Sequence, residues 1–304
     1  MNGFYFVLML TGAVISTALF AARLKKGGKR HALLAAVCAC LLGAVGAKAL
    51  YFLLVLAHDW PSYGLRGLFL FDYYRFSFFG GCLGAVLGVM LYARLAGLDK
   101  LAFLDAFAPA GALMLAFARA SEYFLDGVNI PGEEMENPLF QRFPFAVINE
   151  WEEWYAALFM AAAALALAVC LAGLISKKES RVPGLRMQRT VFYLCLPQVF
   201  LESLRSESIK WGFVRAEQVL CAVCMLFVLI SLCRAARGMG FWKTYWPVAV
   251  DLLCVIVMVG VEFNLDKVFV DVSATVDYAV MWLALLVIAG CECYCVRRRL
   301  AKAS

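Results

Sequence analysis

Long apolar runs alternate with short polar segments along almost the whole chain. A transmembrane helix needs about 20 mostly apolar residues, and runs of that length recur here at regular intervals. The nine candidate spans are residues 3–22, 32–57, 77–96, 101–121, 154–175, 190–205, 216–233, 246–263 and 276–296. The sixth is short and ends in charge, so we expect protein rather than lipid to cover its outer end. The pattern predicts an all-α, polytopic integral membrane protein.

The composition supports this prediction. Of the 304 residues, 64% are hydrophobic and 16% are charged, and the mean hydropathy is +0.81, which is not typical of a soluble domain. The net charge is +6, but the basic residues lie in short loops between the apolar runs. The charge therefore does not indicate a nucleic-acid partner. The first run is long enough to span a bilayer and has no basic segment before it, so we interpret it as a span rather than a cleavable signal.

The basic residues also predict the orientation. They cluster after spans one, five and seven and at the end of the chain, and cytoplasmic loops carry an excess of Lys and Arg. The clusters are Arg23, Lys25, Lys26, Lys29 and Arg30; Lys177, Lys178, Arg181, Arg186 and Arg189; Arg234, Arg237 and Lys243; and Arg297, Arg298, Arg299 and Lys302. We therefore expect the N-terminus outside and the C-terminus in the cytoplasm.

The longest outer loop is the segment 122–153. It is acidic and is interrupted by Pro and Gly, which predicts a small extracytoplasmic cap. The last two spans follow residue 234 and look like an addition, because the charged positions described below are complete without them. We predict a membrane domain at 1–234 and an additional transmembrane hairpin with a basic cytoplasmic tail at 235–304.

The 12 cysteines indicate neither disulfides nor a metal site. Most lie inside apolar runs, where a thiol behaves as a small hydrophobe. Cys221 and Cys224 have CxxC spacing, and three cysteines cluster at 291–295, but no His or further Cys pair completes a tetrahedral set. We expect no metal and no cofactor.

Charged residues lie at two span ends that the topology places on the outer side. Arg119 and Glu122 end the fourth span, and Glu202 and Arg205 end the sixth, where Gln198 lies one turn earlier. Each pair is open to two interpretations. It is either a self-contained ion pair at i,i+3 or a guanidinium positioned to bind a phosphate bidentately. Ionisable residues at membrane depth indicate a functional site by default.

Glycines and one lysine lie near these pairs. Gly80 and Gly81 begin the third span, where exposed backbone N–H groups can hold an anion. Together with Gly84 and Gly88 they also form a small-residue stripe, which is typical of close helix packing. Lys48 in the second span either snorkels outward or joins the same site. We expect an anionic lipid headgroup as the ligand.

These stretches resemble bacterial prolipoprotein diacylglyceryl transferase over roughly residues 1–234. The resemblance implies a seven-helix transferase-like core in the bacterial plasma (inner) membrane, with the hairpin as an addition. The segments that carry it are Tyr5; Gly46-Ala47-Lys48 with Tyr51; Phe78-Phe79-Gly80-Gly81; Asp105 with Ala108-Pro109; Ala118-Arg119-Ala120-Ser121-Glu122-Tyr123; Tyr155; Gln198; Glu202; Arg205-Ser206-Glu207; and Glu217-Gln218.

A member of this family would transfer the diacylglyceryl group of phosphatidylglycerol to the lipobox cysteine thiol of a secreted preprotein. Phosphatidylglycerol, lipobox-containing preproteins and the lipid bilayer are thus the partners it implies, with no nucleic acid. Glu122 or Glu202 would handle the proton, since a free thiol is mostly protonated near neutral pH. The substrate-binding residues would be Arg119, Arg205, Gly80, Gly81, Lys48, Tyr5, Gln198 and Gln218.

Four departures from the family pattern fall in this site. Phe79 stands where the family has its signature His, Gln198 and Lys48 replace arginines, and Glu122 replaces an Asn. The two histidines offer no obvious substitute base: His31 lies beside a basic, cytoplasmic loop, and His58 is in an outer loop.

Two functions therefore remain open. The chain is a divergent diacylglyceryl or related lipid transferase, or it is a catalytically altered homologue. The homologue would bind anionic lipid or lipopeptide and dock a membrane partner through the cap and the hairpin. A transporter is disfavoured, because we find no internal repeat or pair of broken helices.

Overall fold

The computed structural model describes residues 3–24, 28–70, 75–124, 132, 134–135, 137–149, 151–176, 179–205, 209–211, 214–235, 240–267 and 273–303. Within them the chain forms nine α-helices: α1 (Gly3–Arg23), α2 (Gly28–Tyr63), α3 (Phe78–Leu95), α4 (Lys100–Ser121), α5 (Leu158–Ile175), α6 (Leu185–Ser203), α7 (Ala216–Ala235), α8 (Phe241–Lys267) and α9 (Ala274–Ala303). The smaller elements are the 3₁₀ helices η1 (Gly64–Phe69), η2 (Glu122–Phe124) and η3 (Glu179–Arg181), and the strands β1 (Ala146–Ile148), β2 (Trp154–Ala156), β3 (Lys210–Trp211) and β4 (Val214–Arg215).

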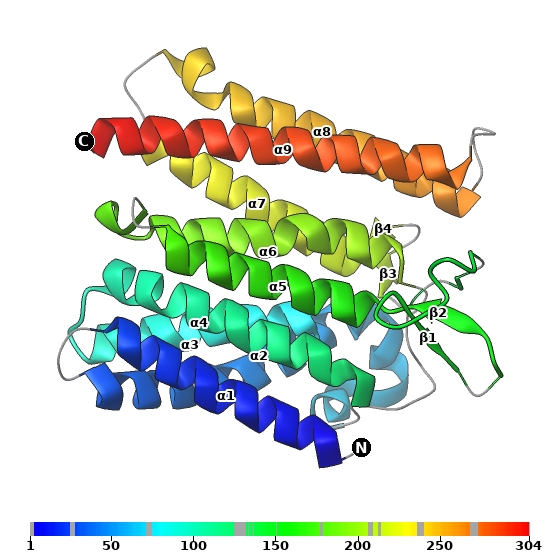
Figure 1. The fold of residues 1–304 in the computed structure, drawn as a ribbon, viewed down its shortest axis with the longest axis horizontal. Coiled ribbons are helices and arrows are strands. Elements are labelled where there is room, and N and C mark those ends of the chain that lie inside the picture. The colour runs from blue at the N-terminus through cyan, green and yellow to red at the C-terminus, as the bar shows by residue number, and fades with distance from the viewer. Residues whose placement is uncertain are drawn as a thin grey trace.

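The helices lie side by side in a bundle (Figure 1). The hairpin α8–α9 forms one side, α1 to α4 form the other, and α5, α6 and α7 lie between them. The N-terminus and the four strands lie at one end of the bundle, here called the N-terminal end, and the C-terminus lies at the opposite end. The two termini therefore lie at opposite ends, as an odd number of spans requires.

The helices confirm the predicted all-α membrane fold. Each of the nine predicted spans coincides with one helix, and eight helices in the described part of the chain are long and apolar enough to cross a membrane. The helix that falls short is α6, whose buried residues include Arg186 and Glu202. It packs against α4, α5, α7 and α9, and this surrounding protein replaces the lipid that its polar residues could not tolerate.

Close contact between α2 and α3 sets the position of the start of α3. A Cβ at Gly80 would lie 2.5 Å from the carbonyl oxygen of Gly46, and one at Gly88 would lie 2.5 Å from that of Cys38. Real Cβ atoms do not approach this closely, so only glycine lets the two backbones touch. The small-residue stripe is thus a packing surface.

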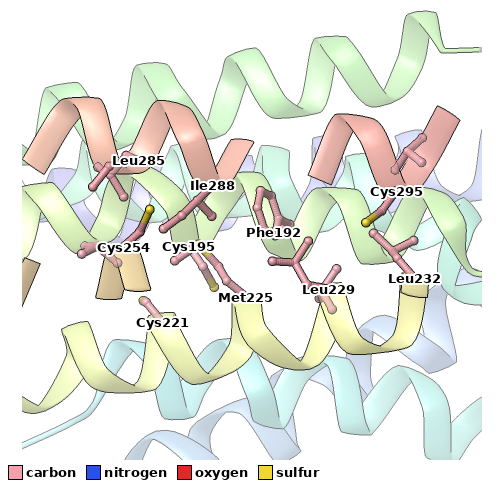
Figure 2. Close-up of a cluster of buried hydrophobic side chains, with 14 of the residues drawn as sticks. Phe192, Cys195, Cys221, Met225, Leu229, Leu232, Cys254, Leu285, Ile288 and Cys295 are labelled. Atoms are coloured by element: carbon pink, nitrogen blue, oxygen red, sulfur yellow. The ribbon is translucent and has the colours of Figure 1, made fainter. Parts of the chain in front are cut away.

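The hairpin α8–α9 shares an apolar cluster with α6 and α7. In Figure 2, side chains of α7 and α9 point toward one another, with Phe192 and Cys195 of α6 between them. Met225, Leu229 and Ile288 are fully buried there. The division of the chain into 1–234 and 235–304 stays a prediction, but the hairpin and the preceding helices share this core.

The described part of the predicted cap forms a small β-hairpin. Strands β1 and β2 pair antiparallel, with Ala146 opposite Ala156, and Asn149 caps the turn by accepting N–H bonds from Trp151 and Glu153. Earlier in the cap, Gly132 pairs through its backbone with Arg205, beyond the end of α6. The cap therefore reaches the helix end that carries Arg205.

Candidate functional site

Ser77 joins three helices at the N-terminal end of the bundle. Its Oγ accepts a hydrogen bond from the N–H of Gly80 at 3.1 Å and donates to Oε1 of Glu217 in α7 at 3.1 Å. Its backbone N–H donates to the carbonyl of Ala47 in α2 at 2.9 Å, and its carbonyl accepts from Gly81 at 3.1 Å. Ser77 is therefore the N-cap of α3, and it already binds the N–H groups of both glycines.

Arg119 is buried at the end of α4 with one donor unused. Its Nη1 donates to Oε1 of Glu122 at 2.7 Å, and its guanidinium lies 3.5 Å from the ring centroid of Phe78. The residue is 4% exposed. Among the residues that the structure describes, its Nη2 has no hydrogen-bond partner. Because a buried, unpaired donor is costly, this nitrogen can accommodate one further hydrogen-bond acceptor.

Glu202 gathers two donors at the end of α6. Its Oε1 accepts from Nη1 of Arg205 at 3.1 Å and from Nε2 of Gln198 at 2.7 Å. Glu202 is 1% exposed, so the ion pair is shielded from solvent on the carboxylate side. Both i,i+3 pairs expected from the sequence thus form.

The helix ends converge on one charged cluster. Arg205 interacts electrostatically with Glu122 of η2 and Glu217 of α7, in addition to its own partner Glu202. Glu217 in turn interacts with Arg119. We call Arg119, Glu122, Glu202, Arg205 and Glu217 the charged cluster.

Tyr5 of α1 lies near this cluster, because it interacts electrostatically with Glu122. Lys48 instead holds the chain that leads into α3, donating to the carbonyl of Leu70 and, at 3.4 Å, to that of Arg75. Gln218 faces α8, where its Nε2 donates to Oε1 of Glu262 at 2.7 Å. The predicted roles of these residues in substrate binding remain predictions.

His31 does not join the charged cluster. His31 lies in the first turn of α2, and its Nδ1 is 2.8 Å from the hydroxyl of Tyr92 near the end of α3. The side chain of His58 lies outside the described residues.

Glu217 is the member of the cluster that our sequence analysis did not select. It appeared there only as a neighbour of Gln218 in a matched segment. An acidic residue in the first turn of a membrane helix was the available signal, since carboxylates favour helix N-termini and charge at membrane depth is rarely incidental.

Comparison with known families decides the family of this chain. A family model described as prolipoprotein diacylglyceryl transferase matches residues 3–234, which include α1 to α7 and every member of the charged cluster. The chain belongs to the prolipoprotein diacylglyceryl transferase family. A search of curated proteins found no match. The hairpin α8–α9 lies outside the region that matches the family.

Phe79 is one of the four positions at which the resemblance predicts a departure from the family pattern. The resemblance places the signature His at this position, and here the Phe79 side chain packs against the apolar cluster of α6 to α9. The charged cluster holds three carboxylates and two guanidiniums.

Proposed function

We propose that this protein is a divergent prolipoprotein diacylglyceryl transferase of the bacterial inner membrane, with the charged cluster on the outer side. Phosphatidylglycerol is the donor, and the lipobox cysteine of a secreted preprotein is the acceptor. The carrying observation is Nη2 of Arg119, a buried guanidinium nitrogen that has no hydrogen-bond partner within the described part of the chain. Membership of the family supplies the reaction class.

The reaction requires one proton transfer and one displacement. The thiol loses its proton, and sulfur attacks the glyceryl carbon that bears the phosphate. The carbon–oxygen bond breaks, and glycerol phosphate leaves with the bonding electrons. Arg119 and Arg205 would bind the phosphate and stabilise the charge that develops on its leaving oxygen.

Glu217 is the best-placed acceptor for the thiol proton. Glu122 and Glu202 each accept a hydrogen bond from an arginine on their own chain segment, whereas Glu217 accepts one from the neutral hydroxyl of Ser77. A carboxylate is a weaker base than a thiolate, so we expect slow turnover.

Transfer of labelled diacylglycerol from phosphatidylglycerol to a lipobox peptide tests this proposal. We expect activity that Arg119→Ala lowers by at least about 10²-fold, since charge stabilisation of this kind is worth that much. Arg94→Ala is the matched control, because Arg94 is an exposed arginine in the last turn of α3, at the other end of the bundle. Equal transfer by both variants would show that the cluster is not the site.

One observation favours a second function, a catalytically altered homologue that binds lipid or lipopeptide. The cluster has one more carboxylate than guanidinium, and Phe79 offers no proton acceptor. Such a protein would retain phospholipid through Arg119 and transfer nothing. Retention of lipid by native mass spectrometry, together with no transfer in the assay above, would select this alternative and direct attention to a partner at the cap and hairpin.

A further inference from the structure

The hairpin outside the family match places a carboxylate beside the charged cluster. Glu262 of α8 is 7% exposed. Its Oε1 accepts from Nη1 of Arg215 at 3.0 Å and from Nε2 of Gln218 at 2.7 Å, and its Oε2 accepts from Oγ of Ser203 at 3.1 Å. Ser203 and Gln218 are themselves buried. One side chain therefore bonds two helices at once.

The bonded residues are direct neighbours of the cluster. Ser203 follows Glu202 at the end of α6, and Gln218 follows Glu217 at the start of α7. Gln218 also donates to the carbonyl of Val199 at 3.0 Å, which links α7 to α6. Through these bonds, the position of Glu262 is coupled to the helix ends that carry Glu202 and Glu217.

A partly open pocket of about 250 Å³ lies between α7 and α8 and is lined by Val219, Ala222, Val255 and Met258, with Gln218 and Glu262 also in its wall. The apolar cluster shared by α6 to α9 continues beside it and includes Met258 and Val261. The polar bonds of Glu262 therefore add to this apolar packing and fix which group of α8 meets the ends of α6 and α7.

We propose that Glu262 is a positioning residue, through which the hairpin α8–α9 holds the end of α6 and the start of α7 in the geometry of the charged cluster. It touches no residue of the cluster by a hydrogen bond and acts through Ser203 and Gln218. The expected effect of Glu262 on lipid binding rests on the proposed function, whereas its expected effect on the ends of α6 and α7 does not.

The same hairpin contains a matched control at its other end. Glu292 of α9 is fully buried and accepts from Arg189 of α6 at 2.9 Å and from the hydroxyl of Tyr193 at 3.0 Å. Arg189 also pairs with Glu179. Glu292 therefore connects the hairpin to α6 much as Glu262 does, but its partners lie roughly two and a half to three and a half turns from Glu202.

Hydrogen exchange of the full-length protein in nanodiscs tests the positioning directly. We expect Glu262→Gln to speed amide exchange at residues 200–203 and 220–223 by about tenfold, as the loss of a charged, buried bond should. Glu292→Gln should leave those amides unchanged and speed exchange near 189–193. Unchanged exchange at 200–203 in Glu262→Gln, or an equal effect of the two variants there, would overturn the proposal.

A milder variant keeps the test decisive if Glu262→Gln does not fold. Ser203→Ala removes one of the three bonds and leaves the pair of Glu262 with Arg215. It should speed exchange at 200–203 by severalfold and leave 220–223 unchanged. An effect at neither segment would show that Glu262 does not hold α6, and the proposal would be wrong.

Lipid retention separates this inference from the proposed function. With phosphatidylglycerol as the probe in native mass spectrometry, Glu262→Gln should lower retention by about tenfold, and Glu292→Gln should not. If Arg119→Ala and the unmodified protein retain the lipid equally, the proposed function is wrong, and the exchange result alone then decides whether Glu262 positions the helices.

Discussion

The hydroxyl of Ser77 donates to Oε1 of Glu217 at 3.1 Å, across 140 residues of sequence. The bond joins the N-cap of α3 to the first turn of α7. It brings a carboxylate to the start of α3, two residues before Phe79. The ionisable group at this place therefore comes from α7.

This relationship predicts that Glu217 matters for turnover more than its partner. Glu217→Gln should lower transfer to a lipobox peptide by about 10²-fold, the contribution expected of a positioned base. Ser77→Ala should cost less, because the carboxylate remains. Glu153→Gln is the control, since Glu153 is an exposed carboxylate of the cap that bonds Asn149 and Tyr155. Full activity of Glu217→Gln would exclude it as the proton acceptor.

A second prediction concerns the geometry of Arg119. Its Nη1 is occupied by Glu122, and Nη2 is buried without a described partner. Arg119→Lys keeps the charge but has no planar fork that could serve both acceptors. We expect retention of phosphatidylglycerol to be highest in the unmodified protein, lower in Arg119→Lys and lowest in Arg119→Ala, as measured by native mass spectrometry after delipidation. Retention of phosphatidylethanolamine equal to that of phosphatidylglycerol would contradict an anion-specific site.

The sequence predicts the fold better than the site for a physical reason. Hydropathy marks each span separately, so nine spans follow without knowledge of their arrangement. The pairs of Arg119 with Glu122 and of Arg205 with Glu202 are also local, since residues three apart share a helix face. The bond of Ser77 to Glu217 depends on how α3 packs beside α7, and no local pattern contains that information.

Helical geometry explains why Glu217 and Gln218 differ. Successive residues on a helix point about 100° apart, so one position cannot face the cluster if its neighbour does. Glu217 faces Ser77 and Gln218 faces Glu262. The sequence did not indicate Glu262 either. Its partners Ser203 and Gln218 precede the hairpin in sequence and become its neighbours only after folding.

A third prediction tests the close contact of α2 with α3. Gly88→Ala should destabilise the protein by roughly 1–3 kcal/mol, as overpacking of a tight contact does, because the new Cβ would meet the backbone of Cys38. Gly260→Ala is the matched control in α8, where a Cβ meets nothing within 4 Å, and it should be neutral or slightly stabilising. Thermal unfolding in detergent measures both. Equal melting temperatures would show that the helices separate without penalty.

The last prediction asks whether the family's chemistry can be restored. Phe79→His alone should not raise transfer, because a base at this position gains little while the phosphate clamp lacks a third arginine. Adding Gln198→Arg supplies a third guanidinium, because the side chain at position 198 bonds Glu202. The site would then contain as many arginines as carboxylates. Base and phosphate clamp act as a unit, so we expect the double variant to exceed both single variants by about 10-fold or more.

The control for this pair is Gln198→Arg alone. It should strengthen retention of phosphatidylglycerol without raising turnover, because it adds charge for binding but no proton acceptor. Labelled transfer and native mass spectrometry on the same four proteins separate the two effects. If Phe79→His raises turnover by itself to the level of the double variant, then a His at position 79 acts as a base without the third arginine, and the proposed dependence of the base on the clamp is incorrect.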